Sequence, residues 1–267
     1  MTLELLVCTI DLGIHNVKHL LLAPIEGVSY LVSWQHSHDF IAHSVPPELQ
    51  RDDVKIITLK GRGLSRNRNN AIRHASADIC LIADDDCTYR SEYFAQIIDV
   101  FSKNTSLHLA TFMMKHSADG KQYPAHSFSL SHYAKGYYAT SFEIAFRREF
   151  VQGRIWFNEN FGLGAPVLQS GEENLFIKDA TDAGLHCRFF PIVVVEHNHP
   201  TTSSSRISQP GVIMAEGAYI SIAYPLSCLP RLLLKAFRLN KANRLGYFKN
   251  LSLLCQGISH IRSKNRI

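Results

Sequence analysis

The sequence lacks the features that would place it in several special classes of protein. Its six cysteines are scattered without a C-x-x-C pair, which argues against a disulfide framework and indicates free thiols in a reducing compartment. No run of about 18–20 apolar residues is present, so we expect no membrane-spanning helix. Glu4 precedes the first apolar run and no basic segment does, so we expect no signal peptide. The 46% of hydrophobic residues favours a folded chain over a disordered one.

Acidic residues are absent from residues 217–267, although nine Lys and Arg occur there. Residues 1–216 contain 19 Lys and Arg against 23 Asp and Glu, so the net charge of +5 hides an acidic part and a basic part. Leu and Phe alternate with Lys and Arg at helical spacing in the basic part. We therefore expect a domain over residues 1–216 and a basic amphipathic helical extension over 217–267. Such an extension suits an anionic membrane surface, or packs on the domain with its charges in solvent.

Apolar runs of strand length alternate with segments of helical periodicity along residues 1–216. Strand, helix, strand at this spacing is typical of a mostly parallel α/β sheet with flanking helices. We expect strands at 3–10, 28–33, 54–59, 79–83, 107–114, 141–147 and 189–195, and helices at 65–77, 91–101 and 173–183.

Three consecutive carboxylates, Asp84, Asp85 and Asp86, directly follow the apolar strand expected at 79–83. Open α/β sheets bind their ligands at the carboxyl ends of strands. Three like charges in one place are costly unless a cation neutralises them, and Mg²⁺ and Mn²⁺ prefer oxygen ligands. The alternative is a solvated acidic turn that starts the next helix.

The segment before this strand gives the acidic cluster a context. Residues 63–72 read Gly-Leu-Ser-Arg-Asn-Arg-Asn-Asn-Ala-Ile. With Arg68-Asn69 followed by Ala71-Ile72, and then Asp84-x-Asp86, the sequence resembles the family 2 glycosyltransferases of bacterial polysaccharide synthesis. The resemblance implies a GT-A fold, which is Rossmann-like. It also implies a nucleotide-sugar site with Arg68, Asn69, Asp84 and Asp85, and a Mn²⁺ or Mg²⁺ ion on Asp84 and Asp86.

A second pair of motifs extends the resemblance to residues 161–174. Phe161-Gly162-Leu163-Gly164-Ala165-Pro166 is similar to the acceptor-side glycine loop of GT-A enzymes, so Gly164 is expected at the nucleotide-sugar site. Glu172 and Glu173 follow where the family has an acid pair, whose second member is the general base of inverting enzymes. Glu173 replaces the usual Asp. The alternative is that both acids only favour the positive end of a helix dipole.

The remaining site predictions come from strand ends. His197 and His199 follow the last expected strand, where the family often has a His that contacts the metal or the diphosphate, and we favour His197. The chain departs from the family after its second strand, where Asp-Asp-Gly-Ser is usual and Ser33-Trp34-Gln35-His36-Ser37 stands here. We expect Gln35 in place of the base-reading acid, and Asp11 as a further nucleotide contact.

Taken together, the resemblance implies metal-dependent inverting transfer of a sugar from a nucleotide diphosphate sugar, with a UDP-sugar as the first candidate. The expected acceptor is a glycan or a lipid-diphosphate-linked molecule in cell-surface polysaccharide synthesis. We expect a cytoplasmic protein that can associate peripherally with the inner membrane face, and no nucleic-acid partner. Two alternatives are a sugar-1-phosphate nucleotidyltransferase, which would need a Gly-rich triphosphate loop near the N-terminus, and a non-catalytic carbohydrate-binding or scaffold protein.

Overall fold

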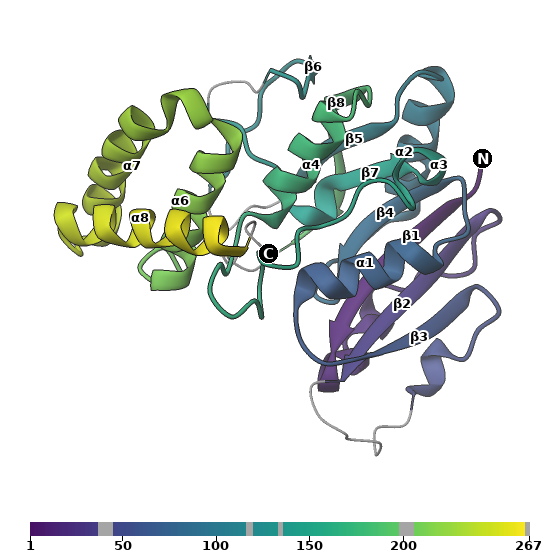
Figure 1. The fold of residues 1–267 in the computed structure, drawn as a ribbon. Helices are drawn as coiled ribbons and strands as arrows, with labels where there is room; N and C mark the ends of the chain where they lie inside the picture. The colour runs from purple at the N-terminus through teal and green to yellow at the C-terminus, as the bar shows by residue number, and fades with distance from the viewer. Residues whose placement is uncertain (37–44, 116–119, 133–135, 198–205, 265–267) are drawn as a thin grey trace.

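The computed structural model describes residues 1–36, 45–115, 120–132, 136–197 and 206–264. Their centre is one eight-stranded sheet in the order β3-β2-β1-β4-β7-β5-β8-β6 (Figure 1). The strands are β1 (Leu3–Ile10), β2 (Val28–His36), β3 (Val54–Lys60), β4 (Ile79–Asp84), β5 (Leu109–Lys115), β6 (Phe128–Ser129), β7 (Ile144–Arg147) and β8 (Cys187–Glu196). The helices that flank or follow the sheet are α1 (Leu64–His74), α2 (Ser91–Lys103), α3 (Arg148–Val151), α4 (Glu172–Asp182), α6 (Pro210–Ala223), α7 (Cys228–Asn243) and α8 (Tyr247–Lys264).

The sheet is mostly parallel, as the sequence indicated. The pairs β3–β2, β2–β1, β1–β4 and β5–β8 are parallel, whereas β7 runs antiparallel to both β4 and β5. The short strand β6 pairs antiparallel with β8 at the sheet edge. The predicted α/β class, a mostly parallel sheet with helices on its faces, is therefore confirmed.

Alternate residues of β1 serve the two faces of the sheet, because successive side chains of a strand point to opposite sides. Leu5 and Val7 belong to the buried cluster that α2 joins through Phe94. Leu6 and Cys8 belong to the cluster on the opposite face, which α1 and α4 cover. All of β1 except its last residue is buried, so both faces of its apolar run Leu5–Cys8 are covered.

One segment expected as a strand begins differently. Residues 141–143 form a 3-10 helix, η4 (Ser141–Glu143), and only 144–147 join the sheet as β7. Two bonds between its ends explain the turn: the Thr140 amide donates to Glu143 Oε2 at 2.8 Å, and the Glu143 amide donates to the Thr140 carbonyl at 3.1 Å. The apolar pattern of 141–147 could not separate these two halves.

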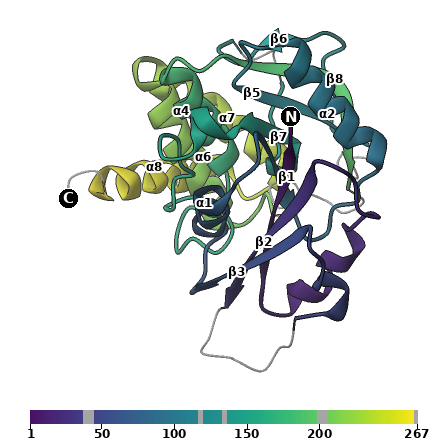
Figure 2. The same cartoon turned by 90° about the vertical axis from the view of Figure 1, so that its right-hand side faces the viewer.

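The C-terminal helices form a unit of their own beside α4 (Figures 1 and 2). Ile213 of α6, Leu232 of α7 and Leu254 of α8 lie in its core. The helix α6 spans residues 210–223, so the boundary expected between residues 216 and 217 falls inside it. Within the described part of the chain, no single helix is long and apolar enough to cross a membrane. Residues 210–223 and 225–243 together reach that length and composition, but they are bent by 116° at the break.

Candidate active site

A cavity of about 910 Å³ lies at the carboxyl ends of β1 and β4. The pairing of Cys8 with Asp84 brings these two strand ends side by side, because the strands are parallel neighbours. The same cavity reaches the first turn of α4 and continues to α6 and α7. Its walls thus come from segments far apart in the sequence. They include Thr9, Gln35, Asp84, Asp85, Asp86, Gly164, Glu172, Glu173, His197, Tyr219, Tyr224 and Lys235.

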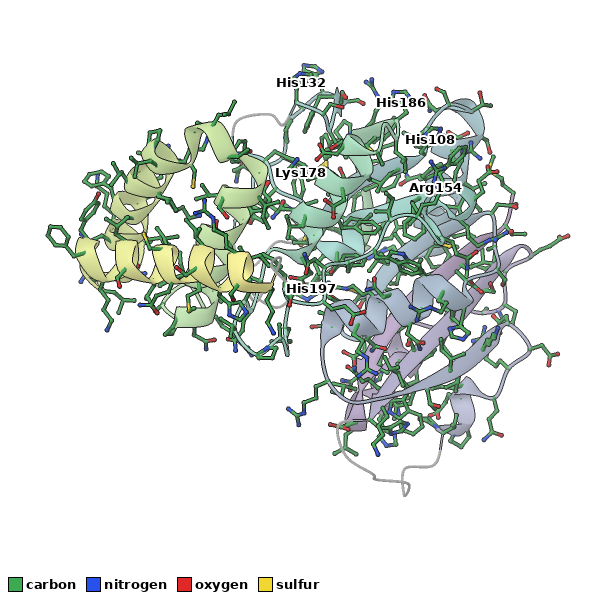
Figure 3. The ribbon with its side chains drawn as sticks, in the orientation of Figure 1. His108, His132, Arg154, Lys178, His186 and His197 are labelled. Carbon is green, nitrogen blue, oxygen red and sulfur yellow. The ribbon has the colours of Figure 1, made fainter. Side chains whose placement is uncertain are left out.

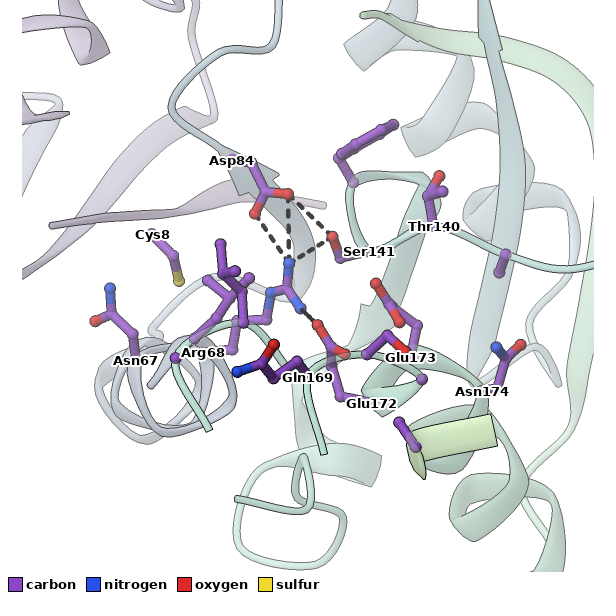
Figure 4. A pocket seen from close by; sticks show the side chains of 18 of the residues that line it. Cys8, Asn67, Arg68, Asp84, Thr140, Ser141, Gln169, Glu172, Glu173 and Asn174 are labelled. Carbon is purple, nitrogen blue, oxygen red and sulfur yellow. Dashed lines mark hydrogen bonds and ion pairs between the residues drawn. The ribbon is translucent and has the colours of Figure 1, made fainter. Parts of the chain in front are cut away.

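Arg68 holds the acidic strand end and the acid pair together (Figure 4). Its side chain is 1% exposed, and its two terminal nitrogens lie 3.0 Å from Asp84 Oδ1 and 2.9 Å from Glu172 Oε1. The same guanidinium donates to Ser141 Oγ at 2.6 Å and lies over the Phe157 ring. A rigid guanidinium fork can bind two carboxylates at once, and pairing is required for a charge at this depth. Arg68 is therefore a fixed cation between the two predicted motifs.

Glu173 lies next to this ion-pair network on the cavity wall. Glu172 and Glu173 rise from the start of α4 toward Asp84 and Ser141 (Figure 4). Burial, and then the neighbouring charge of Glu172, raise the pKa of Glu173 above its ordinary value. A carboxylate with a raised pKa is a stronger base at neutral pH than an ordinary one. Glu172 is bonded to Arg68, so the two acids have different environments.

The three aspartates are also in different environments. Asp84 accepts hydrogen bonds from Arg68 and, at 3.2 Å, from Ser141. Asp85 accepts a hydrogen bond from Thr9, and burial raises the pKa of Asp85 to about 6. Asp86 is the most exposed of the three aspartates, and 44% of its side chain is accessible to solvent. The cluster is therefore not a solvated turn of equivalent acids.

His197 lies beside Asp86, with 3.2 Å between its Nε2 and the Asp86 Oδ2. Its ring stacks on Phe142, which keeps it at the end of β8. His108 and His186 precede β5 and β8, and so lie at the opposite edge of the sheet from His197 (Figure 3). His199 lies outside the described residues.

The side chains at the end of β4 meet the requirements of a divalent metal ion only in part. Among the described residues, no group of three or more His, Cys, Asp and Glu side chains could hold a metal ion. Asp84 is therefore not grouped with Asp86 and His197; its oxygens accept hydrogen bonds from Arg68 and Ser141. Mg²⁺ and Mn²⁺ sites of phosphate-transferring enzymes use one or two carboxylates together with substrate phosphates. The pair Asp86–His197 fits that pattern if a diphosphate completes the site.

Two of the predicted nucleotide contacts are not on the cavity wall. Asn69 bonds both backbone groups of Phe157, at 2.8 and 2.9 Å, so it fixes the loop before the glycine motif. Asp11 begins a short 3-10 helix, and its carbonyl accepts a hydrogen bond from Trp34 Nε1 at 2.9 Å. Gln35 does line the cavity, 2% exposed, and its Nε2 has no hydrogen-bond partner among the described residues. A buried amide donor without a partner is costly, so it is suited to bind a ligand acceptor.

The glycine loop is held against the acid pair by close contacts. A side chain on Gly162 would come within 2.9 Å of the Glu172 carboxyl carbon, and the φ of Gly162 is +102°. A side chain on Gly164 would meet the backbone nitrogen of Gly63 at 3.1 Å. Leu64, the first residue of α1, donates its amide to Leu163 O at 2.9 Å. The loop therefore needs glycine at both positions to join α1 to α4.

Several residues of the site were not predicted from the sequence. Asn67 links the ends of β1 and β2, because its amide donates to the carbonyls of Thr9 and Ser33 at 3.0 Å. It lies inside the motif that carries the resemblance, so its place in the motif was the available signal. Tyr219, Tyr224 and Lys235 come from the helical extension, where no local pattern distinguishes a cavity residue from a surface one.

Comparisons with known proteins agree with this architecture. Residues 37–162 match the family described as glycosyl transferase family 2. No curated protein matches the chain by sequence. The structure of S. aureus TarS 1-349 matches with a TM-score of 0.54 and 16% identity, covering 83% of this chain and 66% of that one.

Two further structures that the chain matches are complexes of S. aureus TarS 1-349 with a ligand. S. aureus TarS 1-349 in complex with UDP matches with a TM-score of 0.54 and 16% identity, over 95% of this chain and 75% of that one. The complex with UDP-GlcNAc matches with a TM-score of 0.51 and 14% identity, over 95% and 76%. The chain spans 43% of the longer S. aureus TarS structure that it also matches. The architecture shared with TarS confirms the predicted GT-A fold, and residues 37–162 of this chain match glycosyl transferase family 2.

Proposed function

We propose that this protein transfers a sugar, with inversion and with a divalent metal ion, from a nucleotide diphosphate sugar to a glycan or a lipid-linked acceptor in bacterial cell-surface polysaccharide synthesis. The observation that carries the proposal is the position of Glu173. It shares one cavity with the acidic end of β4, and its pKa is raised. A base and a diphosphate site at the two sides of one cavity are what glycosyl transfer requires.

The donor is proposed to bind at the ends of β1, β2 and β4. The unpartnered amide of Gln35 is suited to a nucleobase carbonyl, and Asp84 and Asp85 to ribose hydroxyl groups. A UDP-sugar is the first candidate, because TarS structures of the same fold were determined with UDP and UDP-GlcNAc. Asp86 and His197 would hold the metal ion, whose charge neutralises the leaving diphosphate.

Glu173 is proposed to act on the acceptor. An acceptor hydroxyl oxygen attacks the anomeric carbon of the sugar, and the bond between that carbon and the diphosphate oxygen breaks. The electron pair leaves with the diphosphate, while Glu173 takes the hydroxyl proton. A hydroxyl group has a pKa far above 7, so it needs a base that takes the proton as the attack proceeds. Attack from the side opposite the diphosphate inverts the anomeric configuration.

The acceptor is proposed to bind against α6 and α7. Tyr219 and Tyr224 line this part of the cavity with their rings at 88° to each other. Lys235 and Glu216 form an ion pair of 2.8 Å at the same wall. Aromatic faces suit the apolar faces of sugar rings, and the ion pair offers hydroxyl groups both donors and an acceptor. This arrangement supports a sugar-containing acceptor.

The substitution Glu173→Gln tests the proposal. We expect donor binding to persist, while the rate of sugar transfer falls by about 10²–10⁴-fold, because the amide cannot take a proton. Binding of UDP with Mn²⁺ by calorimetry and turnover of UDP-sugars separate the two effects. Glu149→Gln, an exposed acid in α3, serves as the control. Unchanged transfer in Glu173→Gln would refute this role, and pyrophosphate release from UTP and a sugar 1-phosphate would indicate a nucleotidyltransferase instead.

A further inference from the structure

The helix α7 has three distinct faces. Its buried face contains Leu232, Ala236 and Leu239, which pack in the core that α6 and α8 share. At 100° per residue, the other residues of the helix divide into an apolar group and a basic group. The buried face already provides the packing that holds α7 in place, so the two remaining faces are free to serve another purpose.

The apolar group is exposed to solvent. Leu229, Leu233 and Phe237 follow one another at spacings of four residues and lie on one side of α7. Their exposed fractions are 66%, 41% and 49%, and Leu234 is 49% exposed. Leu226, just before the helix, is fully exposed. We call this set the α7 apolar stripe: Leu226, Leu229, Leu233, Leu234 and Phe237.

The basic group lies beside the stripe. Arg231, Arg238 and Lys241 are exposed. Helical spacing places Arg231 and Arg238 between Leu234 and the buried face, and Lys241 between Phe237 and Leu234. No Asp or Glu occurs anywhere in residues 217–267 to compensate them. Phe248 and Lys249, at the start of α8, repeat the combination of an exposed aromatic ring and an exposed cation. The surface therefore combines apolar side chains with positive charges for which residues 217–267 contain no acid.

We propose that α7 docks on a bilayer rich in anionic lipid, with the α7 apolar stripe in the headgroup region and the basic group on lipid phosphates. A helix with one apolar and one basic exposed face is suited to lie in such an interface. A second copy of the chain is a poorer occupant, because two such surfaces would bring like charges together without any acid of residues 217–267 between them.

The same docking places the cavity next to the membrane. Arg231 lies over the ring of Tyr224 at 3.8 Å, and Lys235 bonds Glu216. Tyr224 and Lys235 line the cavity. The α7 apolar stripe and Lys235 of the proposed acceptor wall therefore lie on different faces of the same helix, with Arg231 and Arg238 between them. This step rests on the proposed function: the docked enzyme would receive an acceptor whose lipid anchor stays in the same leaflet.

Co-sedimentation with vesicles tests the docking without any sugar substrate. The wild-type chain is expected to bind vesicles of phosphatidylglycerol and phosphatidylcholine, and to bind pure phosphatidylcholine at least about tenfold more weakly. We expect the pair Arg238→Glu and Lys241→Glu, and separately the pair Leu229→Ser and Phe237→Ser, to weaken the binding to anionic vesicles by about tenfold or more. Lys55→Glu with Lys103→Glu, two exposed residues outside the C-terminal helices, is the matched charge control.

The outcomes separate docking from catalysis. UDP binding with Mn²⁺ should remain unchanged in all these variants, since none of the substituted residues lines the cavity. Equal vesicle binding by the variants and the control would overturn the proposal, and so would absence of binding by the wild type. A dimer in analytical ultracentrifugation that the stripe substitutions dissociate would overturn it too, in favour of a second copy. Vesicle binding with no sugar transfer would contradict the proposed function alone.

Discussion

At the scale of single residues, Arg68 is the centre of the site. It is almost completely buried and compensates Asp84 and Glu172 at once, at 3.0 and 2.9 Å. Removing one partner of a buried ion pair leaves an uncompensated charge in a poorly solvated place. The two carboxylates that Arg68 joins lie on different elements, β4 and α4, so this cation also links two walls of the cavity.

Replacing Arg68 by Met should therefore lower the free energy of unfolding by about 3–5 kcal/mol. Urea denaturation followed by circular dichroism measures this change. Arg90→Met is the control, because Arg90 also bonds a carboxylate, Glu196, at 2.6 Å but is 55% exposed. That variant should unfold at nearly the wild-type midpoint, since water screens the exposed pair. Equal losses in the two variants would show that the Arg68 network contributes no more than a surface pair.

The raised pKa of Glu173 leads to a prediction on pH. Only the ionised carboxylate can take the acceptor proton, and burial with the neighbouring charge of Glu172 delays ionisation to higher pH. The transfer rate at saturating donor should therefore rise across neutral pH, where an ordinary glutamate would already be fully ionised. Rates measured between about pH 5 and 9 test this. Glu172→Gln removes one cause of the shift and should move the rising limb to lower pH; a limb that stays in place would contradict the assignment.

At the scale of elements, the sequence predicted what local periodicity determines. The buried strands 3–10 and 79–84 and the helices of residues 64–74 and 91–103 appear close to their expected positions. The turn at Ser141–Glu143 was missed, because the local bond between Thr140 and Glu143 is only part of what fixes it. Glu143 is fully buried and pairs with Lys121 at 2.6 Å, 22 residues away. This pair holds the segment that carries Ser141 and Phe142, and no periodic pattern encodes it.

In the candidate site, too, the residues within short motifs could be predicted, whereas the directions of their side chains could not. Arg68, Asp84 and the glutamates of α4 could be predicted because each lies in a short motif. The motif did not distinguish Asn69, which points to the Phe157 backbone, from Asn67, which joins the ends of two strands. Neighbours on one helix turn face different directions, so a motif gives the position of a residue in the chain and not its direction.

Close helix packing gives a prediction for the C-terminal unit. The helices α6 and α8 approach so closely that a side chain on Gly257 would collide with the backbone carbonyl of Met214. Gly257→Val should therefore destabilise the unit by about 1–3 kcal/mol, the usual cost of overpacking. Ser252→Ala, at an exposed position of the same helix, is the control. Hydrogen exchange would locate the loss in α6 and α8, and exchange unchanged from wild type would contradict the close contact.

At the scale of the whole molecule, charge and cavity divide the chain in different ways. The acidic part ends at residue 216 and the basic part begins at 217, yet one cavity is lined by both, from Asp84 to Lys235. The division of the chain by net charge therefore does not coincide with the cavity, which is lined by residues of both parts. A ligand that binds at the proposed donor site should therefore stabilise the carboxyl ends of β1 and β4 directly.

Thermal unfolding tests this donor site together with its metal ion. A ligand at about 100 times its Kd stabilises a protein by about 2.7 kcal/mol, which corresponds to a rise in Tm of about 5–10 °C for a domain of this size. We expect UDP with Mn²⁺ to give such a rise, and a chelator to remove it. Asp86→Asn should unfold at the wild-type temperature without ligand and lose the Mn²⁺-dependent rise, because Asp86 and His197 are the proposed ligands. An equal rise with UDP in excess chelator would mean that the donor binds without metal, with Arg68 as the cation nearest to the acidic strand end.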